Sequence, residues 1–314
     1  MAAPEIPKKY KAVIYDKPGT LSTKVVELDT PEPGPGEVLI NLWSQLPFPT
    51  SEGQVGGHEG VGTIVKMGPG AETAAVKVTE YLEVQDTPAH VDPFSPTYEY
   101  SQIPDGLDSA SAAPMLCAGV TTYSALRKCN AQSGDSVVLL GAGGGLGHIA
   151  VQLGSRGMGY RVIGVDADAK EELVLSSGAE HFVPLSAGKA IPDKVKELTG
   201  GLGAHAVVVL TAANGAYAQA IDMLRFGGTL VAVGIPEGEP VAIAGAMPQT
   251  LVAKALKIVG VAVGDRREAI ETMDFARRGI VKSHHRVEKM DALTAVFEEM
   301  EGGKLQGRVV LDLS

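Results

Sequence analysis

The sequence predicts an α/β protein with two domains, one rich in β-strands and one built on a doubly wound parallel sheet. Up to about residue 117, short β-branched runs lie between proline and glycine clusters, which is typical of a small all-β unit. Beyond it, apolar strands alternate with helical stretches, as in a parallel sheet that is buried on both faces. A length of 314 residues also fits two domains at roughly 150 residues each.

The first domain is expected to span residues 1–117 and to be completed by the C-terminal residues 263–314. Its candidate strands are KAVIY at 11–15, EVLINLW at 37–43 and GVGTIVKMG at 60–68. The C-terminal part adds a helix REAIETMDFARRG, an amphipathic stretch MDALTAVFEEMEGG and a final strand GRVVLDL. We expect this tail to fold back onto the first domain.

The second domain, expected at residues 118–262, consists of repeated strands, loops and helices. A helical stretch follows each of three strands: DSVVLL is followed by HIAVQLGSRGM, RVIGVD by AKEELVLSSG, and AVVVLT by AYAQAIDMLR. TLVAVG and ALKIVGVAVG are two further strands. Parallel strands joined by right-handed helical crossovers produce this alternation, so the sequence predicts a doubly wound sheet.

The charge and the cysteine content exclude several classes of protein. The formal net charge is −10 and the isoelectric point about 5.2, the wrong sign for a surface that neutralises phosphates. We therefore expect no nucleic acid and no membrane as partner. Two cysteines are too few for a disulfide framework or a four-thiolate zinc site. Because the sequence shows no signal-peptide core and no run of about 18 apolar residues, we expect a cytoplasmic protein.

The glycine-rich stretch after DSVVLL is the most informative part of the sequence. It follows a strand and opens a helix, where backbone N–H groups and the positive helix end can bind a pyrophosphate. Asp166 ends the next strand 19 positions after Gly147, where a carboxylate can accept hydrogen bonds from both ribose hydroxyls. The cofactor-binding residues expected from this region are Gly141, Gly143, Gly144, Gly145, Leu146, Gly147 and Asp166.

Asp166 also bears on the choice of cofactor. A carboxylate at this place repels a 2′-phosphate, which favours NAD(H) over NADP(H). Lys170 either reaches the same ribose or is an exposed lysine at the start of a helix. Because open α/β sheets bind ligands at the carboxyl ends of their strands, further contacts are expected from Thr121, Leu210, Gly234 and Val263.

Four segments resemble the zinc-dependent alcohol dehydrogenases of the medium-chain dehydrogenase/reductase superfamily, especially their yeast and fungal branch. They are GGHEGVGTIVKMGPGAE, IPDGLDSASAAPMLCAGVTTYSAL, GAGGGLGHIAVQLGSRGMGYRVIGVDADAKEEL and GRVVLDL, and the resemblance covers nearly the whole chain. It implies a GroES-like catalytic domain, completed by the C-terminal tail, that faces a Rossmann domain across a cleft. It also implies that Arg308, in the closing Gly-Arg pair, reaches the cofactor pyrophosphate.

The resemblance further implies a catalytic zinc site that this chain lacks in part. The family places zinc on a Cys in a Cys-His-Thr segment, a His in Gly-His-Glu and a second Cys just before the Rossmann domain. His58 and Cys117 match the second and third ligands, but the segment that carries the first is missing between EVLINLW and PFPTSEGQVGGHEG. The four-cysteine structural lobe is missing too. We therefore expect no bound zinc, unless Glu59 turns its carboxylate toward the cleft.

The candidate catalytic residues are His58, Glu59 and Cys117. His58 is either a residual acid or base in the cleft or a loop histidine held by backbone hydrogen bonds. Cys117 precedes a predicted helix, whose N-terminus can activate a thiol, although a small buried apolar role is more common for such a residue. Four aromatic residues either line the cleft or pack in the core: Trp43, Phe48, Tyr98 and Tyr100.

Hydride transfer itself needs no metal, and several zinc-free members of the superfamily reduce conjugated C=C bonds or iminium groups. We therefore expect a zinc-independent, NAD(H)-linked oxidoreductase that reduces an activated C=C, iminium or carbonyl group of a small to medium organic substrate. The alternatives are a non-redox catalyst of cyclisation or addition with an enlarged, open cleft, and an inactive binding protein. The apolar run KIVGVAVG at 257–264 predicts an edge strand that pairs with a second copy, so a homodimer is expected.

Overall fold

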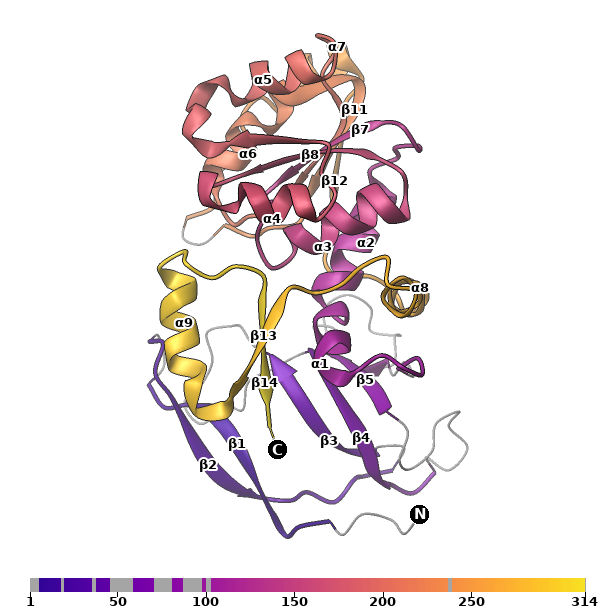
Figure 1. Ribbon diagram of the computed structural model, residues 1–314, viewed down its shortest axis with the longest axis vertical. Coiled ribbons are helices and arrows are strands. Elements are labelled where there is room, and N and C mark those ends of the chain that lie inside the picture. The colour runs from indigo at the N-terminus through magenta and orange to yellow at the C-terminus, as the bar shows by residue number, and fades with distance from the viewer. Residues whose placement is uncertain are drawn as a thin grey trace. The chain divides into compact units, whose positions relative to one another are not determined.

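The computed structural model describes residues 6–17, 20–35, 38–45, 59–70, 81–86, 98–99, 103–236 and 239–313. The chain forms two compact units. The first unit comprises residues 1–117 and 285–314, and the second comprises residues 118–284. Figure 1 shows the helices and strands of both units.

The second unit contains a six-stranded parallel sheet in the order β12-β11-β10-β7-β8-β9. Its strands are β7 (Ser136–Leu140), β8 (Arg161–Asp166), β9 (His181–Pro184), β10 (Ala204–Val209), β11 (Leu224–Ala232) and β12 (Lys257–Gly260). The strand order reverses between β7 and β10, which is the point where open α/β sheets bind ligands. The parallel sheet confirms the predicted α/β class.

Helices complete the second unit, and most of them contact the strands of this sheet (Figure 1). They are α2 (Ala118–Lys128), α3 (Gly147–Gln152), α4 (Glu171–Ser176), α5 (Ile191–Leu198), α6 (Asn214–Ala220), α7 (Pro248–Lys254) and α8 (Arg266–Arg277). A π-helical turn, Leu153–Gly157, continues α3. Short 3-10 turns lie at Asp168–Lys170, Leu185–Ala190 and Ile221–Met223. The central strands β7 and β10 are almost entirely buried, and most of their side chains are apolar on both faces.

The first unit is built mainly from short antiparallel strands. One sheet pairs β1 (Lys9–Tyr15) with β2 (Thr23–Asp29), and another contains β3 (Val38–Gln45), β4 (Glu59–Met67), β5 (Tyr81–Asp86) and β6 (Tyr98–Glu99). A parallel pair joins β13 (His285–Lys289) to β14 (Arg308–Asp312). Two helices, α1 (Ser109–Ala112) and α9 (Leu293–Glu301), and 3-10 turns at Ala113–Met115 and Met290–Ala292 complete it.

The C-terminal residues from His285 onward join the first unit through α9. The rings of Tyr15 in β1 and Phe297 in α9 stack with their centroids 6.4 Å apart. The hydroxyls of Thr23 and Thr294 form a hydrogen bond of 2.9 Å. The apolar face of α9 is buried in a cluster with residues of β1 and β14, and α9 lies beside β1 and β2 in Figure 1.

Residues 263–284 belong to the second unit, whereas the sequence pattern predicts that they complete the first domain. The reason is α8, whose buried residues include Ala269, Met273 and Ala276 and which packs against α2. The amphipathic pattern of α8 predicts that one face is covered, but it does not say which domain covers it. Among the described residues, no helix has the length and apolar character needed to cross a membrane.

Candidate functional site

The carboxyl ends of neighbouring strands in the second unit meet at one edge of the sheet. Backbone hydrogen bonds continue the ladder just beyond these ends. Gly141 donates to the Val165 carbonyl and Leu210 to the Leu140 carbonyl, each over 2.9 Å. Gly234 likewise donates to the Val209 carbonyl over 2.9 Å. The structure thus brings together Gly141, Leu210 and Gly234, which the sequence placed at one ligand site.

The glycine-rich loop between β7 and α3 is closely packed. Gly141 has a φ of +90°, a backbone conformation that favours glycine. A Cβ atom on Gly147 would lie 2.0 Å from the Gly141 carbonyl oxygen. Gly144 donates to that same oxygen over 3.2 Å and closes a turn. The first and last glycines of the motif are therefore required by the backbone itself. Gly145 and Leu146 lie between this turn and the start of α3.

Asp166, at the end of β8, is tied to the same loop. Its Oδ2 accepts the backbone N–H of Gly143 over 2.7 Å, and its Oδ1 accepts the N–H of Ala167 over 2.7 Å. The ammonium of Lys170 lies 3.7 Å from Oδ1. A Cβ atom on Gly143 would come within 2.7 Å of the Lys170 Cβ, so the lysine stem packs directly on this glycine. Gly143, Asp166 and Lys170 thus form one cluster.

Thr211 occupies the space between two of the predicted site glycines. A Cβ atom on Gly234 would lie 2.2 Å from the Thr211 carbonyl oxygen, and one on Gly141 would lie 3.1 Å from the Thr211 Cβ. Tyr217 donates its hydroxyl to the Gly234 carbonyl over 2.6 Å. Thr211 and Tyr217 were not among the predicted site residues. The only sequence signal for Thr211 is that a polar residue ends the apolar run AVVVLT.

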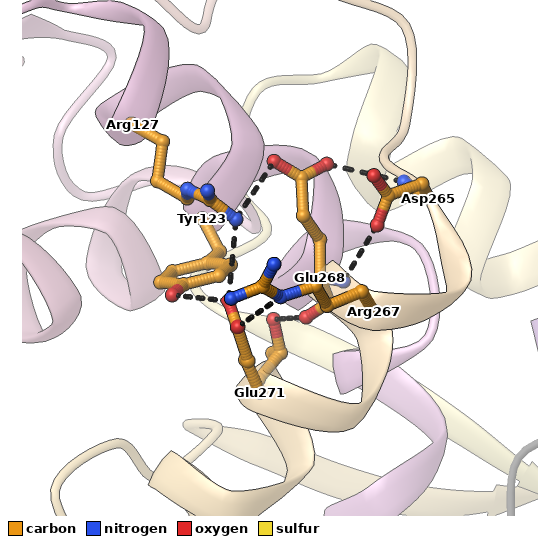
Figure 2. Close-up of polar contacts among 7 residues, drawn as sticks. Tyr123, Arg127, Asp265, Arg267, Glu268 and Glu271 are labelled. Carbon is orange, nitrogen blue, oxygen red and sulfur yellow. Dashed lines mark hydrogen bonds and ion pairs between the residues drawn. The ribbon is translucent and has the colours of Figure 1, made fainter.

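A polar network joins α2 to α8 (Figure 2). Glu271 accepts hydrogen bonds from the Tyr123 hydroxyl over 2.7 Å and from the Arg127 guanidinium over 3.2 Å. Arg127 also lies 3.7 Å from the buried carboxylate of Glu268. Glu268 and Asp265 form a capping box at the start of α8. Burial and the bond to Glu271 raise the pKa of Tyr123 to about 12.

This network fixes the segment that contains Val263 against α2. A Cβ atom on Gly264 would lie 2.7 Å from a methyl carbon of Val120, the neighbour of Thr121. Thr121 is buried in α2. Val263 has a φ of 54°, a left-handed conformation that is strained for a β-branched residue and that occurs preferentially at functional sites. The structure therefore brings Thr121 and Val263 to adjacent elements.

The predicted catalytic residues belong to the first unit. His58 lies outside the described residues, as do Phe48 and Tyr100. Glu59 begins β4 and its backbone pairs with Gln45 and Gln85.

The other predicted residues of the first unit lie in separate elements. Cys117 is partly buried and directly precedes α2. Arg308 begins β14 beside His285, Trp43 lies in β3 opposite Val61, and Tyr98 lies in β6.

The chain matches known dehydrogenases along its length. A family model described as zinc-binding dehydrogenase matches residues 145–278. Alcohol dehydrogenase 2 of Emericella nidulans is 54% identical over 367 aligned positions that cover 100% of both chains. An alcohol dehydrogenase of Schizosaccharomyces pombe is 34% identical, with 98% of each chain covered. The crystal structure of the alcohol dehydrogenase from Aeropyrum pernix shares the fold, with a TM-score of 0.80, 23% identity and coverage of 96% of this chain and 99% of that one.

The alignment with the Emericella protein also bears on the missing segments. It spans 367 positions, whereas this chain has 314 residues, so at least 53 positions of the alignment carry no residue of this chain. The resemblance drawn from the sequence motifs is confirmed by these relatives. The chain belongs to the alcohol dehydrogenase family of the medium-chain dehydrogenase/reductase superfamily, a family of oxidoreductases.

Proposed function

We propose that this protein is an NAD(H)-linked oxidoreductase whose reaction does not depend on zinc. Its substrate is a small to medium organic molecule with an activated C=C, iminium or carbonyl group. One contrast carries the proposal. The glycines of the second unit that are predicted to contact the nucleotide are closely packed, whereas the only two cysteines of the chain lie at opposite ends of one helix.

The glycine-rich loop fits a dinucleotide pyrophosphate. Because Gly141 and Gly147 carry no side chain, the loop backbone closes tightly on itself just before the start of α3. Among the described residues, no acceptor forms a hydrogen bond with the backbone N–H groups of Gly145 and Leu146. Two N–H groups at this position suit phosphate oxygens.

Asp166 fits the adenosine ribose of NAD(H). A carboxylate has about four acceptor positions, and the amides of Gly143 and Ala167 use two of them. The remaining two can accept the ribose hydroxyls. A 2′-phosphate would meet this charge at short range, and Lys170, at 3.7 Å, offsets it only in part. This arrangement supports NAD(H) as the preferred cofactor.

The cysteines of this chain do not match the two cysteine ligands of the family's catalytic zinc site. Cys117 precedes α2 and Cys129 follows it, so at a rise of 1.5 Å per residue about 18 Å of helix separates them. One zinc ion binds thiolates at about 2.3 Å, so it cannot bind both. Cys129 is buried, its Sγ donates to the Ala125 carbonyl, and burial raises its pKa to about 12. The chain therefore offers a single thiolate to a catalytic metal.

The chemistry that remains is hydride transfer between a bound nicotinamide and a substrate that is already electron-poor. The nicotinamide supplies or accepts the hydride when it is bound. The chain's own part is to hold the nucleotide along the strand ends of the second unit, from Gly141 to Val263. We assign the hydrogen bond that polarises the substrate to the first unit, with His58 as the candidate acid.

A homodimer through β12 is part of this proposal. β12 is an edge strand whose Ile258 is 38% exposed. The loop and helix before it expose further large apolar side chains, namely Ile235, Val241, Met247 and Val252. An exposed apolar edge strand promotes aggregation unless another chain pairs with it. A second copy of this chain can pair with β12 and cover the apolar side chains around it.

The proposed function is tested by calorimetry with NADH and NADPH, followed by NADH oxidation with a panel of enals, quinones, cyclic imines and ketones. The expected result is tighter binding of NADH than of NADPH and turnover of at least one substrate class. NADH binding without turnover of any class would favour a nucleotide-binding protein that has lost redox activity. No binding of either nucleotide would overturn the proposal.

A further inference from the structure

Two buried polar side chains of α3 hold the segment 282–284, which is distant in sequence. His148 is fully buried and Gln152, one turn later, is 5% exposed. His148 accepts the backbone N–H of His284 over 2.9 Å, and Gln152 accepts the backbone N–H of Lys282 over 3.0 Å. Buried polar groups of this kind must be satisfied, so these bonds fix where the segment lies.

The hydrogen bonds of His148 select one neutral tautomer of its ring. The N–H of His284 can only donate, so Nε2 must be the acceptor. Nδ1 then carries the proton and donates to the Gly144 carbonyl over 2.8 Å. Gly144 belongs to the glycine-rich loop. One imidazole therefore connects the loop to the segment 282–284, and the rings of His148 and His284 lie edge to face at 6.5 Å.

Gln152 strengthens the same connection with both ends of its amide. Its Oε1 accepts from the Lys282 N–H, and its Nε2 donates to the Lys282 carbonyl over 2.8 Å and to the His148 carbonyl over 3.0 Å. The amide orientation is determined, because each partner is a backbone group with one fixed role. The Gln152 amide thus bonds both the N–H and the carbonyl of Lys282, the two backbone groups that a neighbouring β-strand would bond.

The spacing of the two side chains matches the spacing of their partners. Residues four apart on a helix are separated by about 6 Å along its axis. Residues two apart in a non-helical segment are separated by up to about 7 Å. His148 and Gln152 are four apart, and His284 and Lys282 are two apart. The two side chains therefore hold residues 282 and 284, which are two apart in the segment.

The segment ends where the chain crosses from one unit to the other. His284 is the last residue of the second unit and His285 the first of the returning part of the first unit. Relative motion of two domains is absorbed by a few residues at such crossings. We propose that His148 and Gln152 are positioning residues that couple cofactor binding at the glycine-rich loop to the crossing at 284/285. This inference rests on the proposed nucleotide site.

The two backbone N–H groups at 282 and 284 allow a direct test by hydrogen exchange. Both donate only into these side chains among the described contacts, so their exchange rates follow the two bonds. In the unmodified protein, saturating NADH is expected to slow exchange at Lys282 and His284 by about 5-fold or more, a typical size for coupling between sites. Calorimetry first establishes that NADH binds.

Two substitutions of His148 separate its two hydrogen bonds. In His148→Asn, the shorter side chain keeps a donor for Gly144 but loses the acceptor for His284. In His148→Gln, the amide oxygen reaches His284 but the donor for Gly144 is lost. Both variants are expected to bind NADH and to lose the NADH-dependent slowing at His284. Gln152→Met is expected to remove the NADH-dependent slowing of exchange at Lys282. If neither His148 variant folds, this variant alone tests the coupling.

The matched control is His181→Asn in β9, a histidine that contacts neither the loop nor the segment in the described structure. It should keep the full NADH effect at both amides. The inference is overturned if NADH slows exchange in the loop but not at 282 and 284, or if the His148 and Gln152 variants keep the full effect. Absence of NADH binding to the unmodified protein would instead overturn the proposed function, and this inference with it.

Discussion

Gly143 donates its backbone N–H to Asp166 over 2.7 Å, and this hydrogen bond joins the glycine-rich loop to the end of the neighbouring strand. The same carboxylate accepts the N–H of Ala167, so it organises the backbone on both sides of the proposed ribose site. Asp166, which the sequence predicts to bind the cofactor, thus also supports the loop that is proposed to bind the pyrophosphate.

Replacing Asp166 with Asn should weaken NADH binding by about 10-fold, which corresponds to about 1.4 kcal/mol. The amide keeps one acceptor oxygen, so it cannot accept from both Gly143 and Ala167 while also binding the ribose. NADPH binding should weaken less, because the charge that repels a 2′-phosphate is gone. Calorimetry with both nucleotides measures the two changes.

Asp193→Asn is the matched control, because this carboxylate lies on α5 with 79% of its side chain exposed. It should leave both affinities unchanged. Equal loss of NADH and NADPH affinity in Asp166→Asn would show that the carboxylate supports the loop but does not select the cofactor.

Replacing Gly147 with Ala should destabilise the protein by about 1–3 kcal/mol, a typical cost of overpacking. The added methyl group would lie 2.0 Å from the Gly141 carbonyl oxygen, and that partner is backbone, which cannot swing aside. NADH affinity should fall as well, because the loop must open. Urea unfolding and calorimetry test the two effects.

Gly215 provides the opposite case on another helix. A Cβ atom there meets no other atom within 4 Å, and Gly215 lies in α6. Gly215→Ala should therefore raise stability by about 0.5–1 kcal/mol. Similar urea midpoints for the two alanine variants would contradict the close packing of the loop.

Stability should decrease as the pH falls below about 6.5, the ordinary value for histidine. Burial lowers the pKa of His205, and the guanidinium of Arg225, which contacts the ring, lowers it further. Asp135, at 3.0 Å, acts in the opposite direction. The Ser136 N–H donates to a ring nitrogen over 3.1 Å, which it can do only while that nitrogen is unprotonated. The folded state therefore favours the neutral ring, and its contribution is lost as the pH falls through the folded pKa.

Urea midpoints at about pH 8 and about pH 5.5 measure this dependence on either side of the ordinary histidine pKa. His205→Gln keeps an acceptor for Ser136 but does not titrate, so the difference between the two midpoints should shrink. An unchanged difference in this variant would assign the pH dependence to other groups.

In solution, light scattering should give about twice the chain mass of 32.5 kDa, as closed two-fold dimers are the commonest assembly. Ile258→Lys should shift the protein toward monomer, because it places a charge on the exposed edge strand β12. Val287→Lys, on the exposed strand β13 of the first unit, is the control and should leave the mass unchanged. A monomer at micromolar concentration would exclude the dimer.

The sequence predicted the α/β class and the strands of the second unit because both depend on local patterns. Buried parallel strands are continuous apolar runs, and the glycines of the loop are needed by the backbone around them. The positions of Gly143, Asp166 and Lys170 follow from spacing within one strand–helix–strand unit, so they too could be anticipated.

The contacts of His148 and Gln152 could not be predicted in the same way. Their partners at 284 and 282 lie more than a hundred residues away along the chain, and one histidine and one glutamine in an apolar helix give no sign of what they bind. The boundary at 284/285 was missed for a related reason. The apolar stripe of α8 is visible in the sequence, but its partner α2 is not.

Whether hydride transfer in this protein is independent of zinc can be measured directly on the purified protein. Elemental analysis of the purified protein is combined with NADH turnover before and after chelation, on the substrate class found active. Zinc-independent hydride transfer predicts well under one zinc ion per chain, and turnover that chelation does not change. About one zinc ion per chain, with turnover lost on chelation and restored by added zinc, would contradict it and would show that another residue has replaced the missing cysteine ligand.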